Sequence, residues 1–230
     1  MRYDFFYMVD FEKLFPFWAS LSENERKILS SSAKIEKHEA NHFLRRADGS
    51  CKGAIAVISG SLRVFCQSEE GREVTLYRVR AGEVCFLSAS CLMDSVVFDV
   101  IVETSEESEI CVLPIHVLHR VEKENKDLSL FLYKNAVEKF SKVLWTLQRI
   151  LFMKIDKRIS LFLIEEIERT GETSLNITHD EIARQIGSAR EVVTKTLKYL
   201  SEEGSIKLSR SKIEVLSVGA LKRIAGEKDS

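Results

Sequence analysis

The chain lacks the cysteine patterns that mark a disulfide framework or a zinc site. Its 230 residues contain five cysteines, an odd number, and no two of them stand at Cys-x-x-Cys spacing. Disulfide-rich small domains and structural zinc sites both need paired cysteines at short spacings. We therefore expect neither. The cysteines are Cys51, Cys66, Cys85, Cys91 and Cys111.

The chain also lacks a strong net charge and a long apolar run. Its formal net charge is −1, so the whole chain gives no electrostatic sign of nucleic-acid binding. No segment approaches the length of a membrane span, and Asp4, Asp10 and Glu12 interrupt the aromatic start, which fits no secretory leader. With 45% hydrophobic and 30% charged residues, the composition predicts a cytoplasmic globular protein of two modest domains.

Histidine is absent from the apolar segments between Ala54 and Leu113. Enzymes built on a cupin-like barrel need several histidines and a carboxylate that converge on one metal from adjacent strands. We therefore expect neither catalysis nor a metal site. Two close histidine pairs, His38 with His42 and His116 with His119, have no third ligand at a suitable spacing and are interpreted as surface residues.

Between Ile35 and Leu113 the hydrophobic period is two. Segments such as AIAVI, SLRVFC and EVTLYRV are rich in β-branched and aromatic residues, and Ser59-Gly60 and Ala81-Gly82 are turn signals. This pattern predicts about eight short antiparallel strands with one buried face. Upstream, Ser22 and Glu25 match a capping box at the start of a short helix.

From about Leu128 to Phe152, apolar residues recur every seven positions in two columns, which is typical of a coiled-coil seam. A third column, Ala136, Val143 and Ile150, makes the apolar face wider than one partner helix requires. We expect one side to pack on a second copy of the chain and the other on the sheet. A buried helix in a monomer is the alternative. The seam residues are Leu130, Tyr133, Val137, Phe140, Leu144, Leu147 and Leu151.

The stretch from Thr178 to Leu200 predicts two short helices joined by a sharp turn. Thr178 and Glu181 match a capping box at the start of the first helix, and Gly187 ends that helix. Ser188 and Glu191 match a second capping box, so the second helix is expected to start there. Both helices carry an apolar stripe at three- and four-residue spacing, and together they match a helix-turn-helix.

The flanking segments extend this element into a domain. The segment between Ser188 and Lys212 contains six lysines and arginines but only three glutamates, so positive charge is concentrated here. Upstream, Asp156 is expected to cap a helix that ends at Gly171, which leaves residues 152–156 as a hinge. Downstream, IKLS and KIEVL on either side of Arg210 predict a two-stranded wing.

The run GSAREVVTKTLKYL resembles the recognition helix of the CRP/FNR family of bacterial transcription regulators, and AIAVISGSLRVF is similar to a hairpin of that family. The expected elements follow the family's order over nearly the whole chain. The resemblance implies an α+β fold in three parts. They are an N-terminal helix and antiparallel β-roll at 1–113, a long dimerisation helix with its lead-in at 114–152, and a winged helix-turn-helix at 153–230. The β-roll would be a double-stranded jelly roll like that of cyclic-nucleotide-binding domains.

The resemblance also implies how DNA would be read. In the family, an arginine, a glutamate and a second arginine four residues later reach base edges; Arg190 and Glu191 match, and Lys195 takes the third position. Lysine lacks the planar fork of arginine, which puts specificity at that base pair in question. Capping of its own helix is the alternative role for Glu191. Phosphate contacts are expected from Thr178, Ser188, Lys198 and Arg210, although capping alone would explain Thr178 and Ser188.

The effector of the β-roll is not identified by the sequence. Cyclic-nucleotide binders of the family carry a Gly-Glu pair, which Gly82 and Glu83 match, and then an arginine that neutralises the phosphate. Here no lysine or arginine occurs between Arg80 and Arg120, while seven acids do, so a cyclic nucleotide is disfavoured. The oxygen-sensing branch of the family carries its iron–sulfur cysteines near the N-terminus. Here the first cysteine is Cys51, so a cluster of that type is also disfavoured. The expected effector pocket comprises Gly82, Glu83, Cys85, Ser88, Ala89, Ser90 and Cys91.

Cys85 and Cys91 within this pocket leave a redox-sensing thiol or a soft-metal contact open, but a small buried hydrophobe is the favoured interpretation of each. We predict no cofactor.

Taken together, the sequence patterns and the family resemblance imply a homodimeric, sequence-specific regulator that binds double-stranded DNA at a palindromic operator, with no membrane partner; the contact with RNA polymerase is implied by the resemblance. A signal sensed in the β-roll would change the packing of the dimer helices and so the spacing of the two recognition helices. The alternative function is a ligand-binding module that acts through protein contacts.

Overall fold

The computed structural model describes residues 10–45, 53–86 and 100–226 of the 230. Contacts within the chain divide it into two compact units: residues 1–66 with 76–143, and residues 67–75 with 144–230. Each unit has its own hydrophobic core. Among the described residues, no helix is both long enough and apolar enough to cross a membrane.

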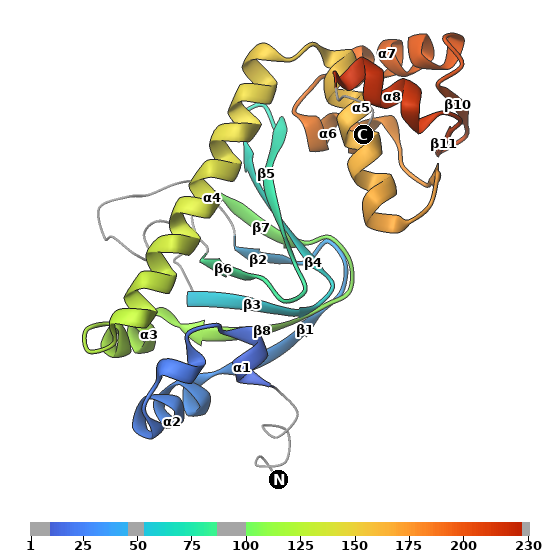
Figure 1. The fold of residues 1–230 in the computed structure, drawn as a ribbon. Coiled ribbons are helices and arrows are strands. Elements are labelled where there is room, and N and C mark those ends of the chain that lie inside the picture. The colour runs from blue at the N-terminus through green and yellow to red at the C-terminus, as the bar shows by residue number, and fades with distance from the viewer. Residues whose placement is uncertain (1–9, 46–52, 87–99, 227–230) are drawn as a thin grey trace. The chain divides into compact units, whose positions relative to one another are not determined.

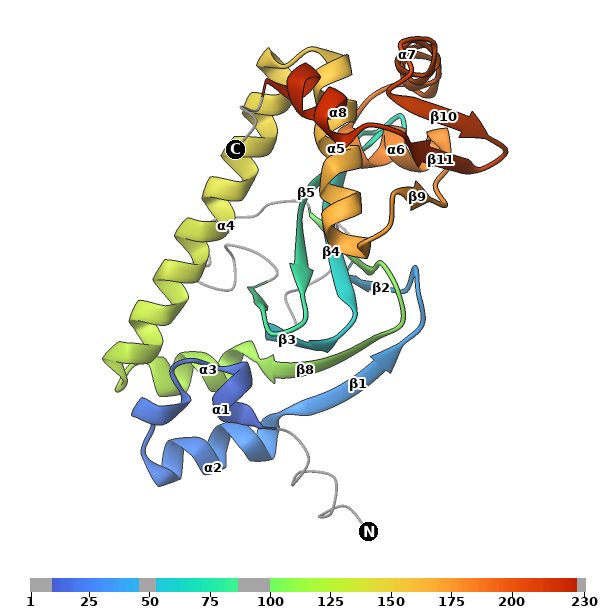
Figure 2. The same cartoon turned by 45° about the vertical axis from the view of Figure 1, so that its right-hand side comes forward.

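Short helices open the first unit: α1 (Phe11–Leu14), the 3₁₀ helix η2 (Trp18–Ser20) and α2 (Glu23–Ser32). The capping box predicted at the start of α2 is confirmed, since the backbone N–H of Ser22 donates to Glu25 Oε2 at 2.7 Å and that of Glu25 donates to Ser22 Oγ at 3.3 Å. Among the described residues, Phe11, Phe15, Phe17 and Trp18 are buried in a cluster that includes residues of β3 (Gly53–Ser59) and β8 (Ser108–Pro114). Figure 2 shows these helices beside α3 (Ile115–Glu122) at one end of the strands.

Eight strands follow among the described residues of this part of the chain, in line with the predicted number of about eight. They form two four-stranded sheets, with strand orders β1-β8-β3-β6 and β2-β7-β4-β5 (Figure 1). All of the registered pairs are antiparallel, which confirms the antiparallel roll. The strands are β1 (Lys34–His38), β2 (Phe43–Arg45), β3 (Gly53–Ser59), β4 (Ser61–Gln67), β5 (Glu73–Arg80), β6 (Val84–Phe86), β7 (Ile101–Thr104) and β8 (Ser108–Pro114).

The turn between β3 and β4 requires its glycine. Gly60 has φ +80°, and a Cβ atom at this position would lie 2.5 Å from the carbonyl oxygen of Glu107. No side chain fits there, and L-residues rarely adopt this conformation. The tight Ser59-Gly60 turn therefore requires glycine at position 60.

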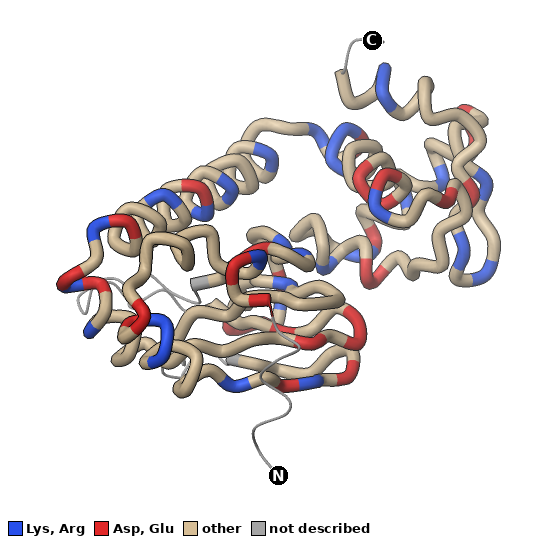
Figure 3. Tube along the Cα trace, turned by 60° about the horizontal axis from the view of Figure 1, so that its bottom comes forward, with Lys and Arg blue, Asp and Glu red and all other residues tan. Residues whose placement is uncertain are grey.

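Helix α3 (Ile115–Glu122) leads into α4 (Lys126–Phe152), which has different environments on its two faces. Leu128 and Leu132 are buried in the core of the first unit, and Lys139 is buried as well. The seven predicted seam residues are all exposed in the single chain, with relative exposures from 44% to 70%. Figure 3 shows lysine, arginine and acidic residues interspersed along α4.

The second unit contains α5 (Ile155–Thr170), β9 (Ser174–Leu175), α6 (His179–Ile186), α7 (Arg190–Glu202), β10 (Ile206–Ser209), β11 (Lys212–Val215) and α8 (Val218–Ala225). The predicted wing strands β10 and β11 pair antiparallel, and β9 joins them as a third strand that the sequence pattern did not predict. Apolar residues of α5, α6, α7 and α8 form one core with the strands.

The predicted cap at Asp156 is wrong. Helix α5 begins two residues earlier than that cap implies, at Ile155, with Lys154 as N-cap and no side-chain capping bond. The Asp156 carboxylate instead accepts from the Lys157 backbone N–H at 2.8 Å, inside the first turn. The predicted end at Gly171 is confirmed, because Gly171 takes the left-handed conformation. The break between α4 and α5 spans only Met153 and Lys154.

Candidate nucleic-acid interface

The first helix of the pair, α6, has the ends that its sequence predicted. The Glu181 backbone N–H donates to Thr178 Oγ1 at 3.2 Å, and the Thr178 backbone N–H donates to Glu181 Oε2 at 2.6 Å. Gly187, at φ 64°, ends the helix, and its N–H donates to the Ala183 carbonyl. Both ends of α6 are therefore fixed by local hydrogen bonds.

A residue that the sequence analysis missed reinforces this C-terminus. Arg158 of α5 is buried, and its Nη2 donates to the Ile186 carbonyl and, at 3.4 Å, to that of Gly187. These carbonyls have no partner inside α6, so the guanidinium supplies one. The available sequence signal was an arginine four residues before Phe162 on the buried face of α5.

The second helix, α7, starts later than predicted. Ser188 and Glu191 form no capping box: α7 begins at Arg190, and its N-cap is Ala189, without a side-chain capping bond. The Ser188 N–H instead donates to the Ala183 carbonyl at 3.0 Å, so Ser188 still belongs to the C-terminal turn of α6. Glu191 consequently does not cap its own helix through Ser188, and its side chain is exposed.

The three predicted base-reading residues share the exposed side of α7. Arg190, Glu191 and Lys195 are all exposed, whereas Val193, Leu197 and Leu200 of the same helix are buried. Arg190 Nη1 lies 3.0 Å from Oδ2 of Asp180 in the first turn of α6. The structure thus brings Asp180, which the sequence analysis did not select, next to a predicted base contact.

The four predicted phosphate-contacting residues differ in how their polar groups are engaged. The Thr178 hydroxyl donates to Glu181 Oε2 at 2.7 Å, and Ser188 is half-buried in the turn. Lys198 Nζ lies 3.9 Å from Glu202 with both side chains largely exposed. Arg210 is exposed in the β10–β11 turn, beside Ser211 at φ 56°. Lys198 and Arg210 therefore have side chains that can reach an anion.

The described part of the predicted effector pocket consists of Gly82, Glu83 and Cys85; Ser88, Ala89, Ser90 and Cys91 lie outside the described residues. Glu83 Oε2 accepts from the Arg80 backbone N–H at 2.9 Å, and Glu83 Oε1 lies 3.5 Å from Lys142 Nζ on α4. The carboxylate is therefore held by its own turn and by the long helix.

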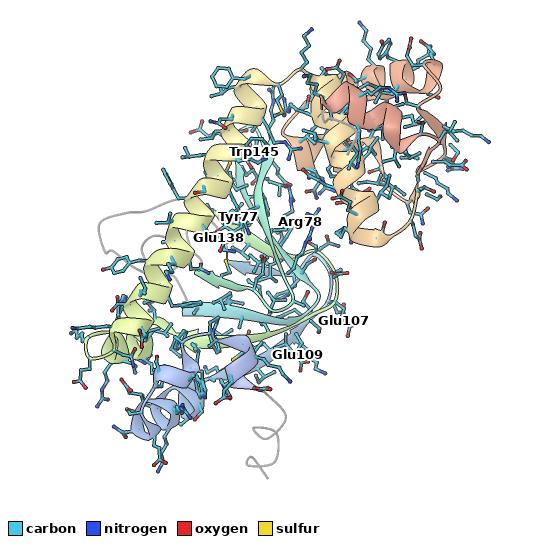
Figure 4. The ribbon with its side chains drawn as sticks, viewed as in Figure 1. Tyr77, Arg78, Glu107, Glu109, Glu138 and Trp145 are labelled. Carbon is cyan, nitrogen blue, oxygen red and sulfur yellow. The ribbon has the colours of Figure 1, made fainter. Side chains whose placement is uncertain are left out.

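A buried lysine lies next to this turn. Lys139 of α4 has its Nζ 5.7 Å from the centre of the Tyr77 ring and 3.7 Å from Glu138 Oε1. Figure 4 shows Tyr77 and Glu138 where β5 meets α4. Burial raises the pKa of the Cys85 thiol to about 11, while the charge of Lys139 opposes that rise. Cys85 is therefore a protonated buried side chain, as the favoured interpretation of this cysteine had it.

An open depression elsewhere on the roll has an acidic lining. Its volume is about 430 Å³, and Gly60, Glu106, Glu107 and Glu109 line it together with Lys37. Figure 4 labels Glu107 and Glu109 at this site. Carboxylates disfavour an anionic ligand here. No group of three or more potential metal ligands occurs among the residues that the structure describes.

These features define a class of protein. An antiparallel roll, a long helix with an exposed apolar seam, and a winged helix-turn-helix with exposed arginine and lysine form a two-part regulator that binds DNA.

Comparison with known proteins agrees with this class. Residues 35–125 match the cyclic nucleotide-binding domain, and residues 157–224 match the Crp-like helix-turn-helix domain. A solved structure of a CRP/FNR family protein from Eubacterium rectale is 34% identical, with a TM-score of 0.89, and the match covers 93% of this chain and 99% of that one. The transcriptional regulator SdrP of Thermus thermophilus is 29% identical over 75% of this chain and 83% of its own length. The cAMP-activated regulator CRP of Haemophilus influenzae is 22% identical over 75% of this chain and 79% of its own.

The chain belongs to the CRP/FNR family and is a DNA-binding transcription regulator.

Proposed function

We propose that two copies of the chain bind a palindromic operator and that each copy reads bases with Arg190, Glu191 and Lys195. Support comes from the exposure of all three side chains on one side of α7, the second helix of the helix-turn-helix. In this element the N-terminal residues of the second helix contact base edges in the major groove. Arginine and lysine donate to guanine, and glutamate accepts from cytosine.

Phosphate contacts would fix the orientation of α7 on the duplex. Lys198 and Arg210 carry exposed cationic groups on α7 and on the wing, which suits them to this role. Thr178 and Ser188 would contribute less, because the Thr178 hydroxyl already bonds Glu181 and Ser188 is part of the α6 turn.

The dimer would form through the apolar seam of α4. Seven large apolar side chains exposed on one face of a 27-residue helix are a strong argument for a partner, since monomers rarely expose a contiguous apolar stripe. Two recognition helices in successive major grooves then match a palindrome with half-sites about one helical turn apart. In this scheme residues 1–113 sense, 114–152 dimerise and 153–230 bind DNA.

Regulation by a signal completes the proposal. The turn at Gly82 and Glu83 is joined to α4 through Lys142, so a ligand that displaced this ion pair would act directly on the dimer helix. The effector is unidentified, and no cofactor is proposed. The setting would be the cytoplasm, with RNA polymerase as a further partner. The match to a Crp-like helix-turn-helix disfavours a module that acts only through protein contacts.

The test is selection of genomic fragments on the purified protein, followed by binding measurements on the best site. We expect a palindrome with half-sites about one turn apart, and an Arg190→Ala variant that binds it about 1–3 kcal/mol more weakly for each half-site. Arg223→Ala, which removes an exposed arginine from α8, is the matched control and should bind normally. If the protein retained all DNA sequences equally with every candidate signal molecule tested, the proposed base contacts would be contradicted.

A further inference from the structure

Arg190 is held by a single protein group among the residues that the structure describes. Its Nη1 lies 3.0 Å from Asp180 Oδ2, and the two side chains are 63% and 55% exposed. Asp180 stands in the first turn of α6, and Arg190 is the first residue of α7. The ion pair therefore joins the N-terminal ends of the two helices.

A second contact joins the same two ends. His179 Nδ1 of α6 lies 2.9 Å from Thr194 Oγ1, and Thr194 is one turn after Arg190 on α7. The first turn of α6 thus has two side-chain contacts with the exposed side of α7. The two contacts join the start of α7 to α6 at two positions one turn apart.

The chemistry of the pair suits base reading. A guanidinium presents its donors in a rigid fork, and a side chain of this length loses about 2 kcal/mol of rotamer entropy when it is fixed. Asp180 engages Nη1, which leaves Nε and Nη2 as a parallel pair of donors on the other edge. That edge matches the O6 and N7 acceptors of guanine.

We propose that Asp180 is a positioning residue that sets the base specificity of Arg190. The carboxylate orients the guanidinium before DNA arrives, and its negative charge penalises complexes in which Arg190 would turn toward a phosphate. Both effects of Asp180 favour binding to the operator over binding to other sequences. This inference rests on the proposed role of Arg190 as a base contact.

A purely structural role for Asp180 makes a different prediction. An acid in the first turn of a helix interacts favourably with the helix dipole, and its removal would lower the stability of α6. That loss is the same for every DNA sequence. It therefore changes affinity without changing discrimination between base pairs, which is the readout that separates the two roles.

The experiment uses the full-length protein and its selected operator. Affinity is measured for the operator, for each single base-pair substitution in one half-site, and for an unrelated duplex of equal length. The variants are Asp180→Asn, Arg190→Ala and the double variant. Glu203→Gln is the matched control, because it removes one exposed carboxylate at the far end of α7.

At the base pair whose discrimination Arg190→Ala abolishes, we expect Asp180→Asn to reduce discrimination about 2- to 5-fold, the range set by an exposed ion pair. The unrelated duplex should bind equally well or more tightly. In the Arg190→Ala background the Asp180 substitution should not change the preference for the operator over the unrelated duplex. In the parent protein, Glu203→Gln should leave discrimination between base pairs unchanged.

Unchanged discrimination in Asp180→Asn would overturn the inference, and so would an equal loss of the preference for the operator over the unrelated duplex in the Arg190→Ala background. Both outcomes leave Arg190 as a base contact. If Arg190→Ala alone binds every sequence as the parent does, the proposed function itself fails. The single variant identifies that outcome before Asp180 is considered.

Discussion

Arg158 is a buried cation at the end of α6. The residue is 8% exposed, and its guanidinium donates to the carbonyls of Ile186 and Gly187. Burial lowers the pKa of this group, and the charge of Arg149 adds to the effect. Its hydrogen bonds hold the turn that leads into Arg190.

We expect Arg158→Met to lower the free energy of opening of α6 and α7 by about 2–3 kcal/mol, because it leaves buried carbonyls without a donor. Hydrogen exchange of the amide protons in these helices, followed by mass spectrometry, measures this quantity. Arg223→Met serves as control and should change it by less than about 0.5 kcal/mol. Equal protection in the two variants would show that the Arg158 bonds contribute nothing.

The thiols provide a second test at this scale. Burial raises the pKa of Cys85 to about 11 and that of Cys111 to about 12, so at pH 8 only about one Cys85 thiol in a thousand is ionised. We expect iodoacetamide at pH 8 to label half-buried Cys66 in the native protein before either of them. Raising the pH toward the pKa of Cys85 should speed its labelling, and unfolding in urea should remove the difference. Labelling of native Cys85 as fast as Cys66 would indicate an accessible thiolate.

Among the elements, α4 has apolar residues on both a buried and an exposed face. Its buried face contains Leu128 and Leu132, and its exposed face contains the seam. The same helix therefore serves the core of the roll and the proposed dimer.

We expect Val137→Asp to convert the protein to monomers, since a carboxylate at a seam position would be buried against its own copy in the partner. Sedimentation velocity measures the change. Ser141→Asp, one turn further on at a flanking position that coiled coils fill with charged residues, is the control and should stay dimeric. Loss of the dimer in both variants would point to damage of α4, and loss in neither would exclude the seam.

The sequence predicted elements well where a local chemical signal was unique. The capping box at Thr178 and the glycine at position 187 mark the two ends of α6, and both ends were predicted correctly. The Ser188 box failed because Ser188 still bonds backward to Ala183, a contact that a Ser-x-x-Glu pattern cannot reveal. Strand β9 has two residues, too few for any periodicity, and exists only because β11 pairs with it.

Local sequence signals predicted only part of the candidate site. Arg190, Glu191 and Lys195 follow from a continuous pattern on one helix. Asp180 contacts Arg190 from α6, and Arg158 bonds the end of α6 from α5; these contacts span ten and 28 residues of sequence. Such pairs depend on the tertiary fold, which no local period encodes.

For the whole molecule, a net charge of −1 means that DNA affinity depends on where the charge lies. Electrostatic binding is set by the phosphates that are neutralised, each of which contributes a salt dependence.

We expect Lys198→Gln to weaken binding to all sequences alike and to reduce the slope of log affinity against log salt by about two, because a dimer carries two copies. Titrations at several salt concentrations measure the slope. Lys123→Gln, located just after α3, should leave it unaltered, and an unchanged slope in Lys198→Gln would remove Lys198 from the interface.

The exposed seam of α4 has a consequence for how the protein behaves in a cell. A free protomer keeps Leu151 at 70% exposure and Val137 at 65%, so in the proposed dimer part of the stabilisation of each fold comes from its partner. Dilution would then separate the chains and also make each one easier to unfold and degrade. The abundance of the regulator would thus control its own turnover, with scarce protomers being cleared fastest.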